Sequence, residues 1–153
     1  MVDIKMLQAN SLFGGLTDEE AEKIHSLLEE EHYPKGADII REGETNDRLF
    51  FLAKGSVNIL KKSARDDDEG EVIAHLSQGD AFGEMELIDI QPSVATVRAA
   101  EDVEALTLSH QDLYTLYQWN VKTFAIIVMN MAREISRRLR KMDAVVAASP
   151  SLT

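Results

Sequence analysis

Apolar positions recur at two different spacings along this 153-residue chain, and the change in spacing divides one domain, residues 1–153, into three parts. In the first part, Thr17 and Glu20 form a capping-box pattern, the sequence signature of a helix N-terminus. Apolar residues then follow at helical spacing from Ala21 to Leu28. The pattern predicts an N-terminal helical segment over residues 10–32.

Between residues 33 and 108, short apolar or alternating runs are separated by turns that contain glycine. These runs lie at residues 39–40, 49–52, 57–60, 72–76, 95–99 and 103–108. Short, evenly spaced strands predict a double-stranded β-helix, or jelly-roll, barrel. The acidic segment 63–70 has few apolar residues, so we expect it to form an exposed hairpin loop.

Helical spacing returns over residues 109–146, where Ser109 and Asp112 can cap a first helix. A longer helix is expected after Asn120. The predicted fold class is therefore mainly β with flanking helices: a jelly-roll barrel with an N-terminal helix and C-terminal helices. The apolar stripe of the last helix predicts a homodimer, because an unpaired stripe is usually covered by a partner. Its members are Val121, Phe124, Val128, Met131, Ile135, Leu139 and Met142.

Charge and composition exclude several classes of protein. The net charge of −11 argues against a general nucleic-acid binder, because phosphate contacts need a basic face. Basic residues at 133, 137, 138, 140 and 141 are interpreted as a solvated face, with a docking surface for an acidic partner as the alternative. The absence of cysteine excludes disulfides and thiol sites. No stretch is long and apolar enough for a membrane span or a signal peptide, so we expect a cytoplasmic protein with no membrane association.

Catalytic patterns are weak. The four histidines are scattered, and no two have metal-site spacing. Ser109, His110 and Asp112 include the residue types of a catalytic triad, but neighbours on one turn point apart. We therefore expect no enzyme activity and no metal or other cofactor. A cupin-like metalloenzyme on a similar barrel is an alternative that would need clustered histidines.

The segment from Gly79 to Thr96 carries the most specific chemistry. A glycine turn is followed by helix-forming residues, a proline and a strand. The free amides that start a short helix suit an anion, and the carboxylate of Glu84 could accept hydrogen bonds from hydroxyls. A ligand with a phosphate and sugar hydroxyls would fit this chemistry.

This segment resembles the phosphate-binding cassette of cyclic nucleotide-binding domains. The resemblance rests on Phe82-Gly83-Glu84-Met85, on Pro92 and on Ala95-Thr96, and the glycine-punctuated strands upstream extend it over most of the chain. It implies a sensor of cAMP or cGMP, with the cassette at residues 82–96. The resemblance implies that Glu84 would accept a hydrogen bond from the ribose 2′-hydroxyl of the ligand. It also implies contacts from the backbone amides of Gly83, Met85 and Ala95 and from the hydroxyl of Thr96.

One position departs from the family pattern. The family has an arginine after the cassette proline, and this chain has Ser93, which offers neither the charge nor the two-pronged donor of a guanidinium. Loss of such a partner costs about 2–5 kcal/mol, or roughly 30- to several-thousand-fold in affinity. Glu86, where the family usually has a small residue, would also repel phosphate. We therefore expect weak or altered cyclic nucleotide binding, with Arg98 as a candidate substitute.

The output of such a sensor also follows from the resemblance. The family places a lid helix after the cassette, and this helix often pairs with its twin. We expect no DNA-binding domain to follow it, so output would pass through the dimer surface or a separate effector protein. The alternative is a domain that binds no small molecule and serves as a dimerisation or interaction module.

Overall fold

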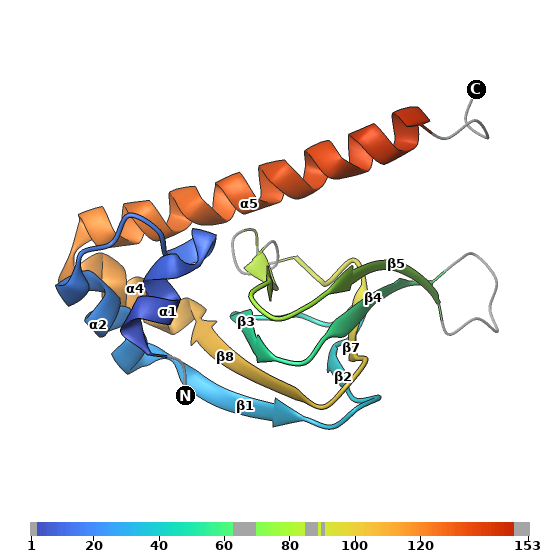
Figure 1. Ribbon diagram of the computed structural model, residues 1–153, viewed down its shortest axis with the longest axis horizontal. Coiled ribbons are helices and arrows are strands. Elements are labelled where there is room, and N and C mark those ends of the chain that lie inside the picture. Colours follow the sequence, from blue (N-terminus) through green and yellow to red (C-terminus); the bar gives the residue numbers. More distant parts are fainter. Residues whose placement is uncertain (1–2, 63–69, 85–88, 90, 149–153) are drawn as a thin grey trace.

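The strands form two four-stranded sheets, with the helices gathered at one end and along one side (Figure 1). The computed structural model describes residues 3–62, 70–84, 89 and 91–148, except for the side chains of 145–148. The first sheet has the order β1 (Glu29–Tyr33), β8 (Val103–Ser109), β3 (Arg48–Lys54) and β6 (Ala81–Phe82). The second has the order β2 (Asp38–Ile40), β7 (Thr96–Ala99), β4 (Val57–Lys61) and β5 (Glu71–Leu76). All pairings are antiparallel, as in the predicted jelly roll.

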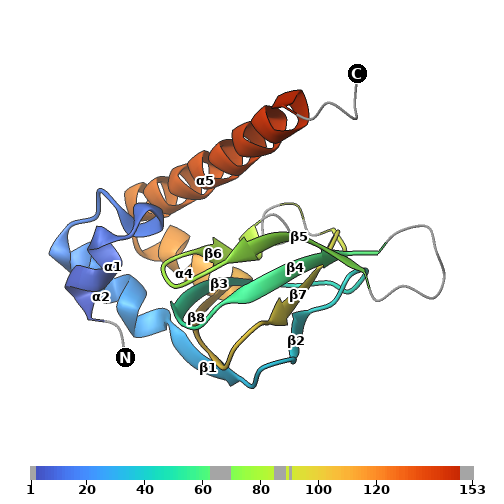
Figure 2. The ribbon, with the colours of Figure 1, turned by 45° about the vertical axis from the view of Figure 1, so that its right-hand side comes forward.

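The helices lie before and after the strands in the sequence. They are α1 (Ile4–Ala9), the short 3₁₀ helix η1 (Ser11–Phe13), α2 (Asp18–Leu27), α4 (His110–Trp119) and α5 (Val121–Ala148). Both predicted caps are present, because Thr17 and Glu20 close a capping box on α2 and Ser109 and Asp112 close another on α4. Helix α5 leaves the helical end and runs along the outside of the strands (Figures 1 and 2).

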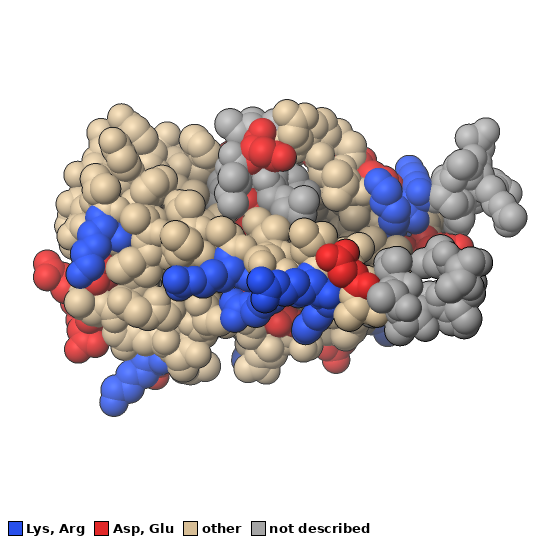
Figure 3. Space-filling model, turned by 90° about the horizontal axis from the view of Figure 1, so that it is seen from above, with Lys and Arg blue, Asp and Glu red and all other residues tan. Residues whose placement is uncertain are grey.

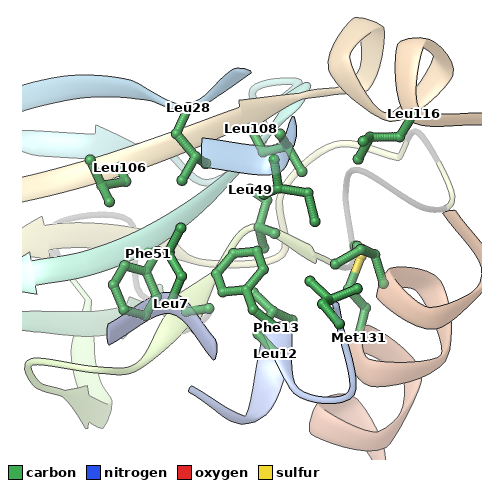
Figure 4. Close-up of a cluster of buried hydrophobic side chains, with 14 of the residues drawn as sticks. Leu7, Leu12, Phe13, Leu28, Leu49, Phe51, Leu106, Leu108, Leu116 and Met131 are labelled. Carbon is green, nitrogen blue, oxygen red and sulfur yellow. The ribbon is translucent and has the colours of Figure 1, made fainter. Parts of the chain in front are cut away.

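Strand β3 contributes to two apolar clusters because neighbouring side chains on a strand point to opposite faces. Phe50 and Leu52 pack between the sheets with Val57, Val97 and residues around them. Leu49 and Phe51 instead pack against the helices, together with Leu7, Leu12, Phe13, Leu106, Leu108, Leu116, Ile127 and Met131 (Figure 4). Strands β3 and β8 of the first sheet are therefore buried on both faces, and the cluster that contains Leu49 and Phe51 fixes the helices to them.

Helix α5 presents two different apolar faces, which corrects the predicted dimer stripe. Met131 is fully buried against the helical cluster, and Phe124 packs at its edge, so neither lies on a free surface. Val121, Leu139 and Met142 are more than half exposed, while Val128 and Ile135 are half-buried. The stripe is one band of side chains, but it is wide: its edge with Phe124 and Met131 adjoins the buried Ile127 and packs on the helical cluster, while its edge with Val121 and Leu139 stays exposed.

Other elements also differ from the prediction. The helical segment expected over 10–32 ends at Leu27, and Glu29–Tyr33 is the edge strand β1. Helix α1 and the two-residue strand β6 were not predicted. The hairpin loop expected at 63–70 lies outside the described residues, except for Gly70. In the part of the chain that the structure describes, no helix is long and apolar enough to cross a membrane.

Candidate functional site

Gly83 ends strand β6 in a conformation that only glycine adopts easily. Its φ is +89°, and a Cβ atom there would lie 2.5 Å from the carbonyl oxygen of Arg48 and 2.9 Å from Nδ2 of Asn46. Both the left-handed backbone and the close approach of β3 therefore require glycine. Phe82 pairs with Phe50 immediately before this point, and their rings stack with centroids 4.9 Å apart. The turn is rigidly placed, and it fixes where Glu84 leaves the sheet.

Glu84 carries a buried carboxylate that is held by a residue far along the chain. The residue is 2% exposed, and Nη1 of Arg138 donates to its Oε1 at 2.5 Å. Nη2 of the same guanidinium donates to the carbonyl oxygen of Ala81. Glu134, one turn earlier on α5, lies 3.6 Å from Nε of Arg138. The guanidinium thus joins α5 to the strand end through a carboxylate and a backbone carbonyl.

The position of Arg138 follows from the face that α5 turns toward the strands. Ile127 and Met131 are fully buried, and Glu134 and Arg138 continue the same helical row at spacings of three and four. From residue 132 to residue 144 the side chains of α5 are half-buried or exposed. Arg138 therefore supplies polar contacts with the sheets in a part of α5 where apolar packing has become sparse.

Ser93 and Ala95 form a closed local arrangement. Ser93 is 5% exposed, and its hydroxyl donates to the carbonyl oxygen of Ala95 at 2.7 Å. The amide of Ala95 points back at Ser93 Oγ over a long 3.5 Å. The backbone of Ser93 pairs with the turn at Gly43 and Glu44 through two hydrogen bonds of 2.8 and 2.9 Å. The loop is firmly held, and the single hydroxyl proton of Ser93 is used inside it.

Thr96 is tied to a polar cluster on the neighbouring strands. Its hydroxyl oxygen accepts from the amide of Glu42 at 3.0 Å. The carboxylate of Glu42 in turn contacts Nζ of Lys61 at 2.8 Å and accepts from the amide of Lys62 at 3.2 Å. Because Lys61 and Lys62 donate to this carboxylate, its pKa is lowered below the usual glutamate value. Nζ of Lys61 also donates to the carbonyl oxygen of Val94 at 2.6 Å.

Arg98, the candidate substitute for the family arginine, is engaged elsewhere. Its Nε donates to Oδ1 of Asp38 at 2.7 Å, and its Nη2 reaches Oδ2 at 3.5 Å. Asp38 lies directly opposite Arg98 in the pairing of β2 with β7. Val97, between Thr96 and Arg98, points into the core, so Thr96 and Arg98 lie on the other face of β7.

The structure separates the predicted site residues into two groups. Ser93, Ala95 and Thr96 are bonded to one another or to the turn at 42–44, whereas the contacts of Glu84 lead to α5. Met85 and Glu86 lie outside the described residues. Among the residues that are described, no group of three or more histidine, aspartate or glutamate side chains is placed to hold a metal ion.

Arg138 is the site residue that the sequence pattern missed. It was grouped with Arg133, Arg137, Arg140 and Lys141 as one solvated basic face. Basic side chains do gather in the middle of the face over which α5 runs (Figure 3). A signal was nevertheless present, because Arg138 falls seven residues after the buried Met131 and so belongs to the inward row of the helix.

Comparisons with known proteins bear on this arrangement. The profile of the family described as cyclic nucleotide-binding domain matches residues 30–120. The cyclic AMP receptor protein of Thermus thermophilus is 30% identical over 137 residues, which is 90% of this chain and 61% of that protein. The cGMP-dependent protein kinase 2 of Homo sapiens is 38% identical over 106 residues, 69% of this chain but 14% of the kinase.

A solved structure extends the comparison to the fold. A cyclic nucleotide-binding domain from Methylobacillus flagellatus superposes with a TM-score of 0.83, at 24% identity, over 95% of this chain and 82% of that one. Its similarity covers the helices as well as the strands. The chain spans less than two thirds of the length of the two curated relatives, so the likeness concerns this domain and not their whole activity.

Proposed function

Since this chain belongs to the cyclic nucleotide-binding domain family, we propose that it is a non-enzymatic regulatory module in the cytoplasm. Its ligand binds against Glu84, and its output is the position of α5. The observation that carries the proposal is the contact of Arg138 with Glu84, because it joins the residue matched to the family's ribose acceptor directly to the helix. Ligand and helix therefore compete for one carboxylate.

The competition can be followed atom by atom. A sugar hydroxyl donating to Glu84 needs the same acceptor as Nη1 of Arg138. When the guanidinium leaves Glu84, its hydrogen bond to the carbonyl oxygen of Ala81 is lost as well. Helix α5 beyond Met131 then loses two contacts with the strands. Because the ligand binds the released state better than the engaged one, occupancy shifts the population of helix positions.

The phosphate side of the site supports weak or altered binding of cAMP and cGMP. Ser93 occupies the position of the family arginine and is almost fully buried. Its hydroxyl donates a hydrogen bond to the carbonyl oxygen of Ala95. Arg98 is bonded to Asp38 through two nitrogen atoms, so it does not stand in for the family arginine without breaking that contact. The cassette therefore keeps the carboxylate that would bind the ribose, Glu84, and lacks the cation that would bind the phosphate.

A direct test measures binding and helix release together. We expect calorimetry with cAMP, cGMP, adenosine and guanosine to show binding of at least one, and Glu84→Gln to weaken that binding tenfold or more. Hydrogen exchange of residues 132–144 should rise on binding. Glu44→Gln is the matched control, because Glu44 lies near the cassette loop and is exposed. Binding of none of the four, or equal binding by Glu84→Gln, would overturn the proposal.

A second candidate role, as a dimerisation or protein-interaction module, is favoured by the outer face of α5. Exposed or half-buried apolar positions recur there at alternating steps of four and three residues, the spacing of a coiled-coil seam. They are Val121, Ala125, Val128, Ala132, Ile135, Leu139 and Met142. This seam lies on a different face from the buried row that ends at Arg138. We propose that it pairs with a second copy of the chain, and a separate effector protein remains the alternative partner.

A further inference from the structure

The charge and hydrogen bonding around Glu84 specify the class of ligand more closely. We infer that the site prefers a neutral ligand with two neighbouring hydroxyls, the chemistry of a ribonucleoside 2′,3′-diol, over a cyclic phosphodiester. This inference rests on the proposed function, since it assumes that the ligand binds at Glu84, and it names the chemical class. It uses the described residues alone.

Three basic side chains described near the cassette are already matched by carboxylates. Lys61 lies 2.8 Å from Glu42, and Arg98 lies 2.7 Å from Asp38. Arg138 lies 2.5 Å from Glu84. A phosphate that recruited any of these cations would separate it from its carboxylate and leave two negative groups close together. Like charges at such a distance disfavour each other strongly where water is partly excluded.

In the loop that carries a cation in the family, the serine hydroxyl of this chain is already engaged. Ser93 has one hydroxyl proton, and that proton is directed to the carbonyl oxygen of Ala95. While this hydrogen bond is kept, Ser93 Oγ presents only lone pairs to a phosphate oxygen. Both atoms would then be acceptors, and their contact would be unfavourable. A neutral ligand does not need this donor, so the closed arrangement of Ser93 and Ala95 carries no penalty for it.

A diol can replace the donor that Nη1 of Arg138 brings to Glu84 and can add a second one. A carboxylate has two oxygens and accepts two parallel donors readily. Two neighbouring hydroxyls of a ribose present a similar fork without any charge. In a 3′,5′-cyclic nucleotide the 3′-oxygen is esterified, so only the 2′-hydroxyl can donate. The nucleoside therefore brings one more donor to Glu84 and one fewer negative charge.

Matched ligands on the natural chain test the inference. Adenosine and cAMP differ by the cyclic phosphate, and 2′-deoxyadenosine and 3′-deoxyadenosine each lack one hydroxyl. We expect adenosine to bind at least about tenfold more tightly than cAMP, and each deoxynucleoside to bind about tenfold more weakly than adenosine. Ser93→Arg, which restores a cation to the loop, should shift the ratio toward cAMP. If that variant fails to fold, the four ligands still decide the question.

The outcomes separate this inference from the proposed function. Binding of cAMP as tight as or tighter than that of adenosine, with loss in Glu84→Gln, would overturn the neutral-ligand inference and leave the sensor proposal standing. Adenosine binding that is unchanged by removal of either hydroxyl would overturn the role of the diol. Binding of neither compound at millimolar concentration would overturn this inference, and it would overturn the proposed function as well if cGMP and guanosine also failed to bind.

Discussion

Arg138 on helix α5 donates a hydrogen bond of 2.5 Å to Glu84, 54 positions earlier in the sequence. Glu84 lies two residues beyond the short strand β6. The carboxylate is almost fully buried, while the guanidinium is about one third exposed. This difference in exposure decides which partner leaves the contact more easily. The buried carboxylate of Glu84 needs a hydrogen-bond donor, and Arg138 can leave for water at lower cost.

Removing Arg138 should therefore destabilise the domain by leaving Glu84 without its guanidinium partner. We expect Arg138→Ala to lower the free energy of unfolding by about 1–3 kcal/mol in urea denaturation at neutral pH. Arg137→Ala is the control, because Arg137 is exposed and its contact with Glu134 lies within one turn of helix. That variant should change the stability by no more than about 0.5 kcal/mol. Equal effects of the two variants would show that the contact with Glu84 contributes nothing.

The turn at Gly83 should tolerate no side chain. In Gly83→Ala the new methyl group meets the carbonyl oxygen of Arg48 in a backbone with φ of +89°. Gly36 has nearly the same φ, +90°, but nothing lies within 4 Å of its added Cβ. We expect about 1 kcal/mol of destabilisation for Gly36→Ala and at least about 3 kcal/mol for Gly83→Ala, measured by thermal and chemical unfolding. Similar losses would mean that the approach of β3 is easily relieved.

A buried carboxylate on α2 should make stability depend on pH. Thr123, the third residue of α5, donates to Oε2 of Glu20 at 2.5 Å, and the amide of Thr17 donates to Oε1 at 3.0 Å. The hydrogen bond from Thr123, followed by that from Thr17, lowers the pKa of Glu20 below its ordinary value of 4.5. A lowered folded-state pKa stabilises the protein above about pH 4.5, and the contribution is lost as the pH falls through the folded-state pKa.

The variant Thr123→Val removes this donor while keeping the shape of the side chain. We expect a loss of about 1.5–3 kcal/mol in the free energy of unfolding at pH 7, which shrinks as the pH falls below about 4.5. Thr115→Val is the control, since the Thr115 hydroxyl donates to the backbone oxygen of Gln111 on an exposed helix surface. A loss from Thr123→Val that stayed constant between pH 7 and pH 3 would contradict the link to Glu20.

Helices α2, α4 and α5 and six of the eight described strands were predictable because the sequence marks them locally. Capping boxes at Thr17 and Ser109 and the alternation of side chains along β3 depend on neighbouring residues, and the structure contains all three. The strand β1 was missed because Glu29, Glu30 and Glu31 are poor strand formers. Its formation depends on pairing with β8, more than seventy residues away.

The site was predictable in part for the same reason. Gly83 and Glu84 were identified from a local motif, and the backbone at Gly83 explains its glycine. The inward direction of Arg138 depends on how far α5 runs along the strands, which no local pattern contains. The engagement of Arg98 likewise depends on the register between β2 and β7.

The outer seam of α5 predicts the state of association. Leu139 is 58% exposed, so Leu139→Glu should leave the fold of the monomer intact. If two copies pair along the seam, this substitution places charges in the interface, and light scattering at tens of micromolar should change from a dimer mass to a monomer mass. Arg140→Glu places the same side chain one residue away, off the seam, and should remain dimeric. A monomer mass for the natural chain would contradict the dimer.

The distance between α5 and β5 tests the central claim, that Glu84 holds α5 through Arg138 until a ligand takes its place. The chain has no cysteine, so Val72→Cys on β5 and Lys141→Cys on α5 can carry two spin labels, diluted with unlabelled chain. Both positions are exposed. Double electron–electron resonance should give one narrow distance distribution for the natural site. The account predicts that saturating adenosine and Arg138→Ala each broaden or shift this distribution; distributions that superimpose in all three samples would contradict it.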